Sequence, residues 1–236
     1  MDFDFGRAFK AYLDATYGSE NKTPTVGRYW PSQLGYCLRR QWFRFRKPKP
    51  PRPDSYRYFE RGNMFHEWVS YVLSRAPGFR LLSSERSLSI VDYQSDPPFV
   101  LDGRLDDFLL VEDQEASRRI LIEVKTTERS LSKLEKPDRP HLLQVQPYIL
   151  SAHADEAYIL YLRPNLESKT FRVEYDPVLM EELMQRGKTL DACLRMGVPP
   201  VAEGKRDPDL RWECEKRCEY RAECDALELS GGLEEA

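Results

Sequence analysis

The sequence predicts an α/β protein in which helices cover a mixed β-sheet. Stretches with apolar residues at every second position, typical of strands, fill the middle of the 236-residue chain. Segments with a period of three to four, typical of helices, precede, interrupt and follow them. The length is enough for one substantial core with a small appended part. The sequence contains no internal repeats or low-complexity tracts.

Helical patterns dominate the first third of the chain. Helices are expected over residues 2–17, 32–45 (after a Ser32 cap) and 59–74, with residues 18–30 as a loop. The third helix is expected to bury a stripe formed by Phe65, Trp68, Val69 and Val72. Residues 47–55, KPKPPRPDS, hold four prolines and are expected to be extended.

Strand patterns then take over. Strands are expected over residues 80–92, 98–112, 118–127, 155–164 and 169–176, the last two joined by a turn near Asn165. Helices are expected over residues 138–151 and 177–196. Residues 197–209 are expected to be a linker that leads to a cysteine-rich tail.

Two neighbouring strands are expected to form a hairpin across the polar residues 112–118. If Val111 faces Arg118 or Arg119, Asp106 lies within one residue of direct opposition to Glu123, with Cβ atoms about 5 Å apart. Strand alternation then places Asp106, rather than Asp107, on the polar face, provided that no bulge intervenes.

Two carboxylates held this close repel each other unless a cation joins them, and their oxygens suit Mg²⁺ or Mn²⁺. Lys125 lies two residues beyond Glu123 on the same face, where it could hold an attacking water or offset charge on a phosphate. The alternative is a surface hairpin in which Glu123 and Lys125 form an ordinary charged pair.

Two helices carry further candidates. His66 lies beside the expected aromatic stripe, where it is either structural or part of the site. His141, Gln144 and Tyr148 share one helix face, from which Gln144 and Tyr148 could bind a phosphate or orient Lys125. The alternative is an ordinary helix that docks a polar edge.

The chain has five cysteines, and three lie close together in the tail as Cys214, Cys218 and Cys224. Without a secretion signal, this grouping indicates a metal before a disulfide, and Cys37 is the candidate fourth ligand. Four thiolates can hold zinc or a [4Fe–4S] cluster, and spacing does not separate the two. Cys193 is expected to be a small buried hydrophobe.

Charge is unevenly distributed along the chain. Residues 39–61 hold nine Lys and Arg against two acids, interleaved with aromatic residues, whereas residues 207–236 hold ten acids against four bases. Such a basic, aromatic stretch suits a nucleic-acid backbone and stacked bases. The alternative is a helix followed by a solvated loop.

The order of these motifs resembles the CRISPR-associated Cas-four nucleases, within the RecB-like branch of the PD-(D/E)XK nucleases. The resemblance covers residues 29–227 and is carried by Cys37, His66, G-x-x-D at Gly103–Asp106, E-V-K at Glu123–Lys125, Q-x-x-x-Y at Gln144–Tyr148, and the tail cysteines. It implies a restriction-endonuclease-like core, with an iron–sulfur subdomain that joins the N-terminal helical region to the C-terminal tail.

The resemblance also implies roles and segments. It implies metal ligation by His66, Asp106, Glu123 and the Val124 carbonyl, catalysis by Lys125, and positioning by Gln144 and Tyr148. It implies a [4Fe–4S] cluster on Cys37, Cys214, Cys218 and Cys224. DNA binding is expected from Arg39, Arg40, Arg44, Arg46, Lys47 and Arg61. The expected segments are 1–78 (helical, with the basic stretch), 79–198 (nuclease core) and 199–236 (cluster-binding tail).

The resemblance therefore implies a deoxyribonuclease dependent on Mg²⁺ or Mn²⁺, acting as an exonuclease on single-stranded DNA or overhangs, and processing prespacers beside the CRISPR integrase. The alternatives are a free-standing RecB-like repair, plasmid or phage exonuclease, a catalytically silent module that binds DNA or the integrase, and a redox iron–sulfur protein. Cys214 and Cys218 stand three residues apart where the family usually has two. Residues 1–27 exceed the motifs and are left for a partner or dimer contact.

The sequence shows no membrane-spanning apolar run and no secretory pattern at its N-terminus, so a cytoplasmic location is expected.

Overall fold

The computed structural model describes residues 4–18, 24–112 and 116–231. Parts of three expected elements therefore lie outside the described residues: the start of the first helix, residues 19–23 of the following loop, and residues 113–115 of the polar hairpin loop. The chain divides into two compact units. The first comprises Met1–Val26, Tyr36–Glu60 and Thr189–Ala236, and the second comprises Gly27–Gly35 and Arg61–Lys188.

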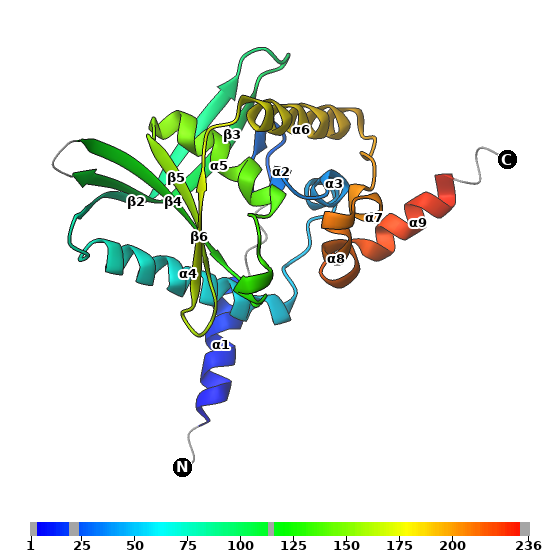
Figure 1. The fold of residues 1–236 in the computed structure, drawn as a ribbon. Helices are drawn as coiled ribbons and strands as arrows, with labels where there is room; N and C mark the ends of the chain where they lie inside the picture. Colours follow the sequence, from blue (N-terminus) through cyan, green and yellow to red (C-terminus); the bar gives the residue numbers. More distant parts are fainter. Residues whose placement is uncertain (1–3, 19–23, 113–115, 232–236) are drawn as a thin grey trace. The chain divides into compact units, whose positions relative to one another are not determined.

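A six-stranded mixed sheet forms the centre of the second unit (Figure 1). Its strands are β1 (Arg28–Tyr29), β2 (Phe79–Asp92), β3 (Phe99–Glu112), β4 (Ser117–Thr126), β5 (Glu156–Leu162) and β6 (Ser168–Val173). They follow the order β1-β3-β4-β5-β6, with β2 also paired to β3. The β1–β3 and β4–β5 pairs are parallel and the other pairs are antiparallel.

Helices are shared between the two units. The second unit contains α2 (Pro31–Leu34), the short 3-10 helix Leu131–Lys133, α5 (Arg139–Ala152), and most of α4 (Pro53–Leu73) and α6 (Pro177–Met196). The first contains α1 (Phe5–Tyr17), α3 (Leu38–Arg46), α7 (Glu203–Arg206), α8 (Pro208–Lys216) and α9 (Arg221–Gly231). The expected mixed sheet flanked by helices is confirmed.

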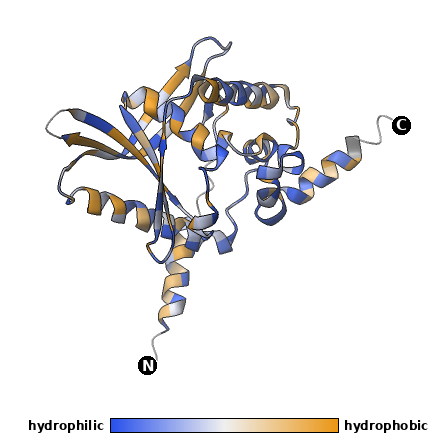
Figure 2. Cartoon of the chain, in the orientation of Figure 1, coloured by the Kyte–Doolittle hydropathy of each residue, from blue (hydrophilic) through white to orange (hydrophobic). Residues whose placement is uncertain are grey.

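The two faces of the sheet bury different helices because side chains alternate along β4. Leu121 packs with Val145 and Tyr148 of α5, whereas Val124 packs with Val69 of α4. Figure 2 shows the hydrophobic residues that α4 and α5 contribute. This two-sided burial holds β4 inside the core, which is where Glu123 and Lys125 lie.

Three helical expectations were wrong. The helix expected over 32–45 is broken into α2 and α3, and α4 begins at Pro53, inside the segment expected to be extended. Proline is tolerated in the first turn of a helix, so the proline-rich segment can end in a helix start. The expected linker 197–209 contains α7 and the beginning of α8.

The buried stripe of α4 also differs from the expected one. Trp68 and Val72 are 41% and 40% exposed. The residues that pack against the sheet are Phe65, Val69 and Leu73, spaced by four. The expected stripe was rotated by part of a turn, because a helix with apolar residues around much of its circumference does not fix its own orientation.

The two units are defined by how compactly their residues pack, whereas the three segments expected from the sequence were defined by function. The segment boundaries at residues 78 and 198 therefore stay a prediction. No helix in the described part of the chain combines the length and apolar character needed to cross a membrane.

Gly35 allows α2 to approach α5 closely. A Cβ atom at this position would lie 2.6 Å from Pro140 Cα, so Gly35→Ala is expected to lower the free energy of unfolding by about 1–3 kcal/mol. Gly62→Ala is the matched control, because a Cβ at Gly62 meets nothing within 4 Å and alanine favours a helix by up to about 1 kcal/mol. Chemical denaturation measures both, and equal stabilities of the two variants would contradict the close packing.

Candidate active site

The pairing of β3 with β4 sets the position of the two central carboxylates. Val111 pairs with Arg118, Phe108 with Leu121 and Asp107 with Ile122. The register predicted from Val111 and Arg118 is therefore confirmed as far as Asp107. Asp106 follows at the end of this paired stretch, where it accepts a hydrogen bond from Val124 N, next to Glu123.

The regular alternation of β3 is interrupted next to Asp106. Leu105 and Phe108 pack into the same core cluster, although residues three apart in a regular strand face opposite sides. On the neighbouring strand, Glu85 has a left-handed backbone with φ of 54°. The alternation that this placement assumed is therefore interrupted, although Asp107 and Leu105 keep a regular pairing with Ser84 and Arg86 of β2. Asp107 is also fully buried, with Ser70 Oγ donating to its Oδ1 at 2.6 Å.

Glu123 is the centre of the site and is 0% exposed. Lys125 Nζ donates to Glu123 Oε1 at 2.7 Å and to Gln144 Oε1 at 2.9 Å. Gln144 Nε2 donates to the same Glu123 oxygen at 2.5 Å. The other oxygen, Oε2, is buried without a hydrogen-bond partner. Such an oxygen is costly to bury unless a cation or a donor reaches it.

Asp106 connects Glu123 to α4. Its Oδ2 accepts a hydrogen bond from Val124 N at 2.7 Å, and its Oδ1 lies 3.2 Å from His66 Nδ1. His66 Nδ1 also lies 3.5 Å from Glu85 Oε1. Among the described residues, His66, Glu85 and Asp106 are the one group of three or more His, Cys, Asp or Glu with ligand atoms all within 4.8 Å.

Glu85 was not foreseen from the sequence. It lies in the serine-rich stretch LLSSERSLS, where a charged residue at a strand position is unremarkable. Its left-handed backbone has no reliable signal in a single sequence, because glycine and asparagine, rather than glutamate, mark such positions.

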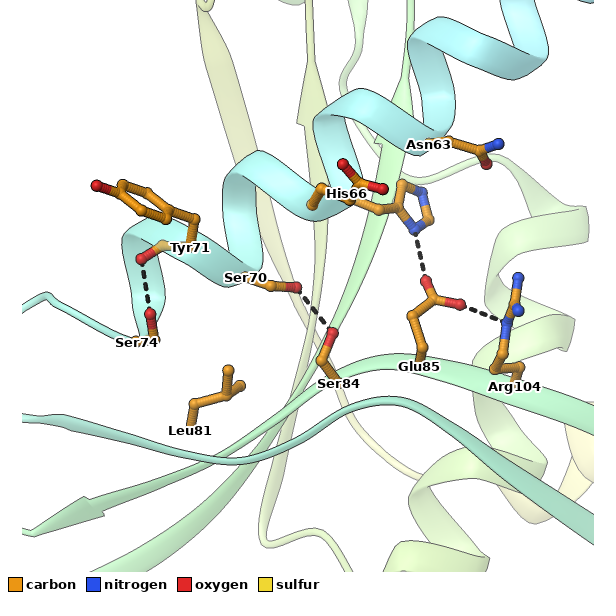
Figure 3. Close-up of a pocket in the computed structure, with 10 residues that line it drawn as sticks. Asn63, His66, Ser70, Tyr71, Ser74, Leu81, Ser84, Glu85 and Arg104 are labelled. Atoms are coloured by element: carbon orange, nitrogen blue, oxygen red, sulfur yellow. Dashed lines mark hydrogen bonds and ion pairs between the residues drawn. The ribbon is translucent and has the colours of Figure 1, made fainter.

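A pocket of about 610 Å³ opens beside this group, between α4 and β2 (Figure 3). One apolar residue, Leu81, lines it, and the other lining residues carry hydroxyl, amide, imidazole or charged groups: Asn63, His66, Glu67, Ser70, Tyr71, Ser74, Ser84, Glu85 and Arg104. In Figure 3, Glu85 lies between His66 and Arg104, with contacts to both. The ligand cluster is therefore open to molecules in solution.

The electrostatics of the site favour a cation. Burial, followed by the charge of Asp106, raises the pKa of Glu123 to about 7 in spite of Lys125. Burial lowers the pKa of His66, but hydrogen bonds with Asp106 and Glu85 outweigh it and raise the pKa to about 10. The pKa shift of His66 reflects the negative charge of Asp106 and Glu85, whereas the pKa shift of Glu123 reflects burial first and the charge of Asp106 second.

Gln144 and Tyr148 reach the site from α5, as expected. The Tyr148 ring lies against Gly103, where a Cβ would stand 2.5 Å from Tyr148 Cε1. Burial and the charge of Glu123 raise the pKa of Tyr148, so its hydroxyl stays protonated. His141 instead shares a hydrogen bond of 2.7 Å with Tyr161 Oη, and burial lowers its pKa well below the ordinary value.

These donors fit a hard divalent cation. Carboxylate oxygens and an imidazole nitrogen converge, and Glu123 Oε2 is left without a partner. The backbone of Val124 is in the same place, since its N–H binds Asp106. The Val124 carbonyl as a ligand stays a prediction.

All five cysteines lie in the first unit. Cys37 directly precedes α3, and both Cys37 and Cys214 flank Gly204, where a Cβ would stand 3.6 Å from Cys37 Cβ and 3.0 Å from Cys214 Cβ. Cys224 is buried in a cluster with Phe43 and Tyr220, against which Cys218 packs. Cys193 is only half-buried, so its expected burial was overstated.

The basic stretch has internal partners. Arg39 Nε donates to Pro200 O at 2.6 Å, and Arg40 forms ion pairs with Glu213 and Glu219. The others with a partner are Arg44 (Gln41), Arg46 (Leu194 carbonyl) and Arg61 (Glu128). Lys47 is exposed. These contacts give the stretch a structural role, and its role in DNA binding stays a prediction.

No family model matches the sequence, and no curated protein matches it. Among solved structures, SSO0001 is similar with a TM-score of 0.67 and 18% sequence identity, over 94% of this chain and 98% of that chain. The two proteins therefore share a fold.

Two exonuclease structures are similar at a lower level. The alkaline exonuclease LHK-Exo of Laribacter hongkongensis gives a TM-score of 0.48 and 14% identity, over 79% of this chain and 93% of that chain. A phage related exonuclease from Haemophilus somnus 129PT gives 0.45 and 14%, over 68% and 82%. These likenesses are too weak to support a conclusion about this chain.

The raised pKa of Glu123 predicts a pH-dependent stability in the metal-free protein. The folded state holds the proton more tightly than the unfolded chain, so stability is present below the ordinary pKa of 4.5 and is lost as pH rises through about 7. In EDTA, Glu123→Gln is therefore expected to gain stability relative to wild type between pH 5 and pH 8.5, by up to about 3 kcal/mol.

Denaturation curves of both proteins across this range measure the gain. Glu112→Gln, at an exposed position, is the control and is expected to follow wild type. A difference between wild type and Glu123→Gln that does not change with pH would contradict the buried charge.

Proposed function

We propose that this protein is a divalent-metal-dependent deoxyribonuclease. The observation that carries the proposal is the buried group of Asp106, Glu123 and Lys125, in which one carboxylate oxygen has no partner. Neither a structural core nor an ordinary surface hairpin has a use for that arrangement.

In this proposal, His66, Asp106, Glu123 and the Val124 carbonyl hold Mg²⁺ or Mn²⁺. A divalent cation bound there would polarise a phosphoryl oxygen and lower the pKa of a bound water. Lys125 is fixed by Glu123 and Gln144, at 2.7 and 2.9 Å, so its charge is already oriented before a phosphate arrives.

Gln144 and Tyr148 act as positioning residues. Gln144 forms hydrogen bonds with both Glu123 and Lys125, and these bonds restrain the positions of the two side chains. Tyr148 packs against Gly103 and keeps its proton, so its hydroxyl can donate a hydrogen bond to DNA.

DNA is the proposed substrate, chiefly as single strands or overhangs, and a CRISPR-adaptation setting with the integrase as partner follows from the family resemblance. The pocket beside His66 supports a strand substrate, since it offers an exposed aromatic residue, Tyr71, with hydroxyl and amide groups. A free-standing repair or phage exonuclease would use the same site. A cytoplasmic location stays part of the proposal.

End-labelled single-stranded and duplex DNA, incubated with Mg²⁺ or Mn²⁺, tests the activity. Wild type is expected to shorten the single strand, and Glu123→Gln and Lys125→Ala are each expected to lose at least about a hundredfold in rate, because each removes charge stabilisation at the phosphate. Lys133→Ala, on an exposed lysine of the short 3-10 helix, is the control that should keep full activity.

Intact DNA after incubation with a well-folded wild-type protein would refute the nuclease. The binding-module alternative would then be tested by DNA binding in the same buffer.

We also propose that Cys37, Cys214, Cys218 and Cys224 hold a [4Fe–4S] cluster. The lack of a side chain at Gly204 leaves room between Cys37 and Cys214. Cys37 directly precedes α3, and Arg39 Nη1 lies 3.8 Å from Cys224 Sγ. When bound, the cluster would cross-link Cys37 to the tail of the same unit and could exchange electrons.

Cys218→Ala is expected to lose the brown chromophore and bound iron, and with them several kcal/mol of stability in the first unit, roughly the range of a lost structural metal ligand. Cys193→Ala is the matched control and should keep both, because Cys193 uses its carbonyl, not its thiol, to bind Trp42. Iron and zinc analysis with visible absorption measures the effect. A stable, colourless and active Cys218→Ala would refute the structural role, and stoichiometric zinc in wild type would refute the cluster.

A further inference from the structure

We infer that the first unit carries a contact surface for single-stranded DNA, formed by Arg57, Tyr58, Trp212 and Arg217. The inference rests on the proposed nuclease function, which it deepens by assigning residues outside the candidate active site to the binding of the strand. None of these four residues was expected from the sequence to bind DNA.

The four side chains form a continuous series of contacts between cations and aromatic rings. The guanidinium carbon of Arg217 lies 5.1 Å from the centre of the Trp212 ring and 5.4 Å from the centre of the Tyr58 ring. The guanidinium carbon of Arg57 lies 5.1 Å from the centre of the same Tyr58 ring. All three distances are within the range of about 6 Å for cation–π attraction. Cations and rings therefore alternate between the first turns of α4 and the C-terminal half of α8.

The charges of Arg57 and Arg217 are left for a partner. Both side chains belong to exposed residues, and among the described residues neither forms an ion pair with an aspartate or a glutamate. The charge of Arg217 also acts on Glu213, but the carboxylate of Glu213 is paired with Arg40. Arg40 of α3 thus holds the unit together, whereas the charges beside the two rings are not used in this way.

The hydrogen-bond donors of these stacked guanidinium groups remain available. The N–H groups of arginine lie in the plane of the guanidinium, so contact of its face with a ring uses none of them. Arg57 Nη2 has one long contact, at 3.5 Å, with the Tyr58 hydroxyl. Each guanidinium can therefore donate two parallel hydrogen bonds to one phosphate.

Trp212 supplies the second feature that a single strand needs. Its side chain is 52% exposed although it contacts Arg217. An unpaired base can stack on an exposed aromatic ring whatever its sequence, and cations beside such rings bind the backbone that connects the bases. The exposed indole therefore favours single-stranded DNA over a purely acidic segment of protein.

The surface has few charges, which limits the number of phosphates that it can contact. Two exposed acids, Asp54 and Glu215, lie on the same two helices and reduce its net charge. Each phosphate neutralised on a single strand contributes about −0.7 to the slope of log affinity against log salt concentration. Arg57 and Arg217 are each expected to contribute one such step.

Fluorescence anisotropy of labelled oligothymidine tests the inference with the full-length protein, in buffer without Mg²⁺ or Mn²⁺ and over a range of salt concentrations. Arg217→Gln is expected to weaken binding about fivefold and to make the salt slope shallower by about 0.7. Trp212→Ala is expected to weaken binding at least about fivefold with an unchanged salt slope. Arg217→Lys should keep the slope and recover only part of the affinity, because lysine keeps the charge and loses the planar donors.

Lys10→Gln is the matched control. Lys10 is exposed on α1 of the same unit and pairs with Asp14, so this variant removes one positive charge away from the surface and should bind as wild type does. If the contacts only held α8 against α4, Arg217→Gln would lower the denaturation midpoint and keep the wild-type salt slope. That result would overturn the inference.

A footprint on wild type decides the matter even if a variant does not fold. Bound oligothymidine is expected to protect Arg57 and Arg217 from phenylglyoxal, as measured by mass spectrometry, and to leave the exposed Arg7 of α1 as reactive as before. Equal modification of Arg57 and Arg217 with and without the strand would overturn the surface.

The outcomes separate the two proposals. Unchanged affinity in both Arg217→Gln and Trp212→Ala would overturn the surface while leaving a nuclease that cleaves DNA intact. Wild type that binds the strand through these residues and does not cleave it with Mn²⁺ would overturn the nuclease and leave the surface. Wild type that neither binds nor cleaves DNA would overturn both.

Discussion

The burial of the Glu123 carboxylate in the sheet is the constraint on which the site depends. A shift of its pKa from 4.5 to about 7 corresponds to about 3 kcal/mol of unfavourable burial when the group is ionised and no metal is bound. Glu123 stays buried in spite of this free-energy cost because contacts from β3, α4 and α5 hold the site together. Strand β3 sets Asp106 level with Glu123, Val124 packs under α4, and α5 supplies Gln144. The two close contacts made by glycine, Gly35 with Pro140 and Gly103 with Tyr148, fix α5 at the distance at which Gln144 reaches the site.

The first unit uses its charges differently. The basic stretch and the acidic tail, far apart in the sequence, pair with each other inside this unit through Arg40 with Glu213 and Glu219, and Lys49 with Glu223. Pairs of this kind close to the cysteines serve to hold the tail against α3. These pairs also show why the number of Lys and Arg in a sequence segment overestimates the basic surface that is available to nucleic acid. Charge in a local window says nothing about the partner that a distant segment brings.

Much of the fold and half of the site followed from the sequence for a physical reason: period-two alternation fixes both strand location and register when a hairpin is short. The sequence thus placed Asp106 beside Glu123, and Gln144 and Tyr148 on one face of α5. Glu85 could not be found in the same way, because its position beside His66 depends on a left-handed backbone and on Arg104 from the neighbouring strand. The predictions of the orientation of α4 and of its first residue were wrong for a related reason. Both are decided by tertiary packing, and the local pattern permits several answers.

The same energetic constraint separates an enzyme from a silent binding module. Replacing a buried ion pair with apolar groups of similar size is often neutral or stabilising. A module that used this fold only to grip DNA would thus gain stability by losing Glu123, Lys125 and the partnerless oxygen. In this chain the charged residues are present. Lys125 and Gln144 donate to the same Glu123 oxygen, and the other oxygen has no hydrogen-bond partner. In the proposed nuclease, a cation would bind that second oxygen. Metal-dependent catalysis requires ligands that bind the cation in preference to protons. A carboxylate group that is unfavourable to bury without a cation meets this requirement.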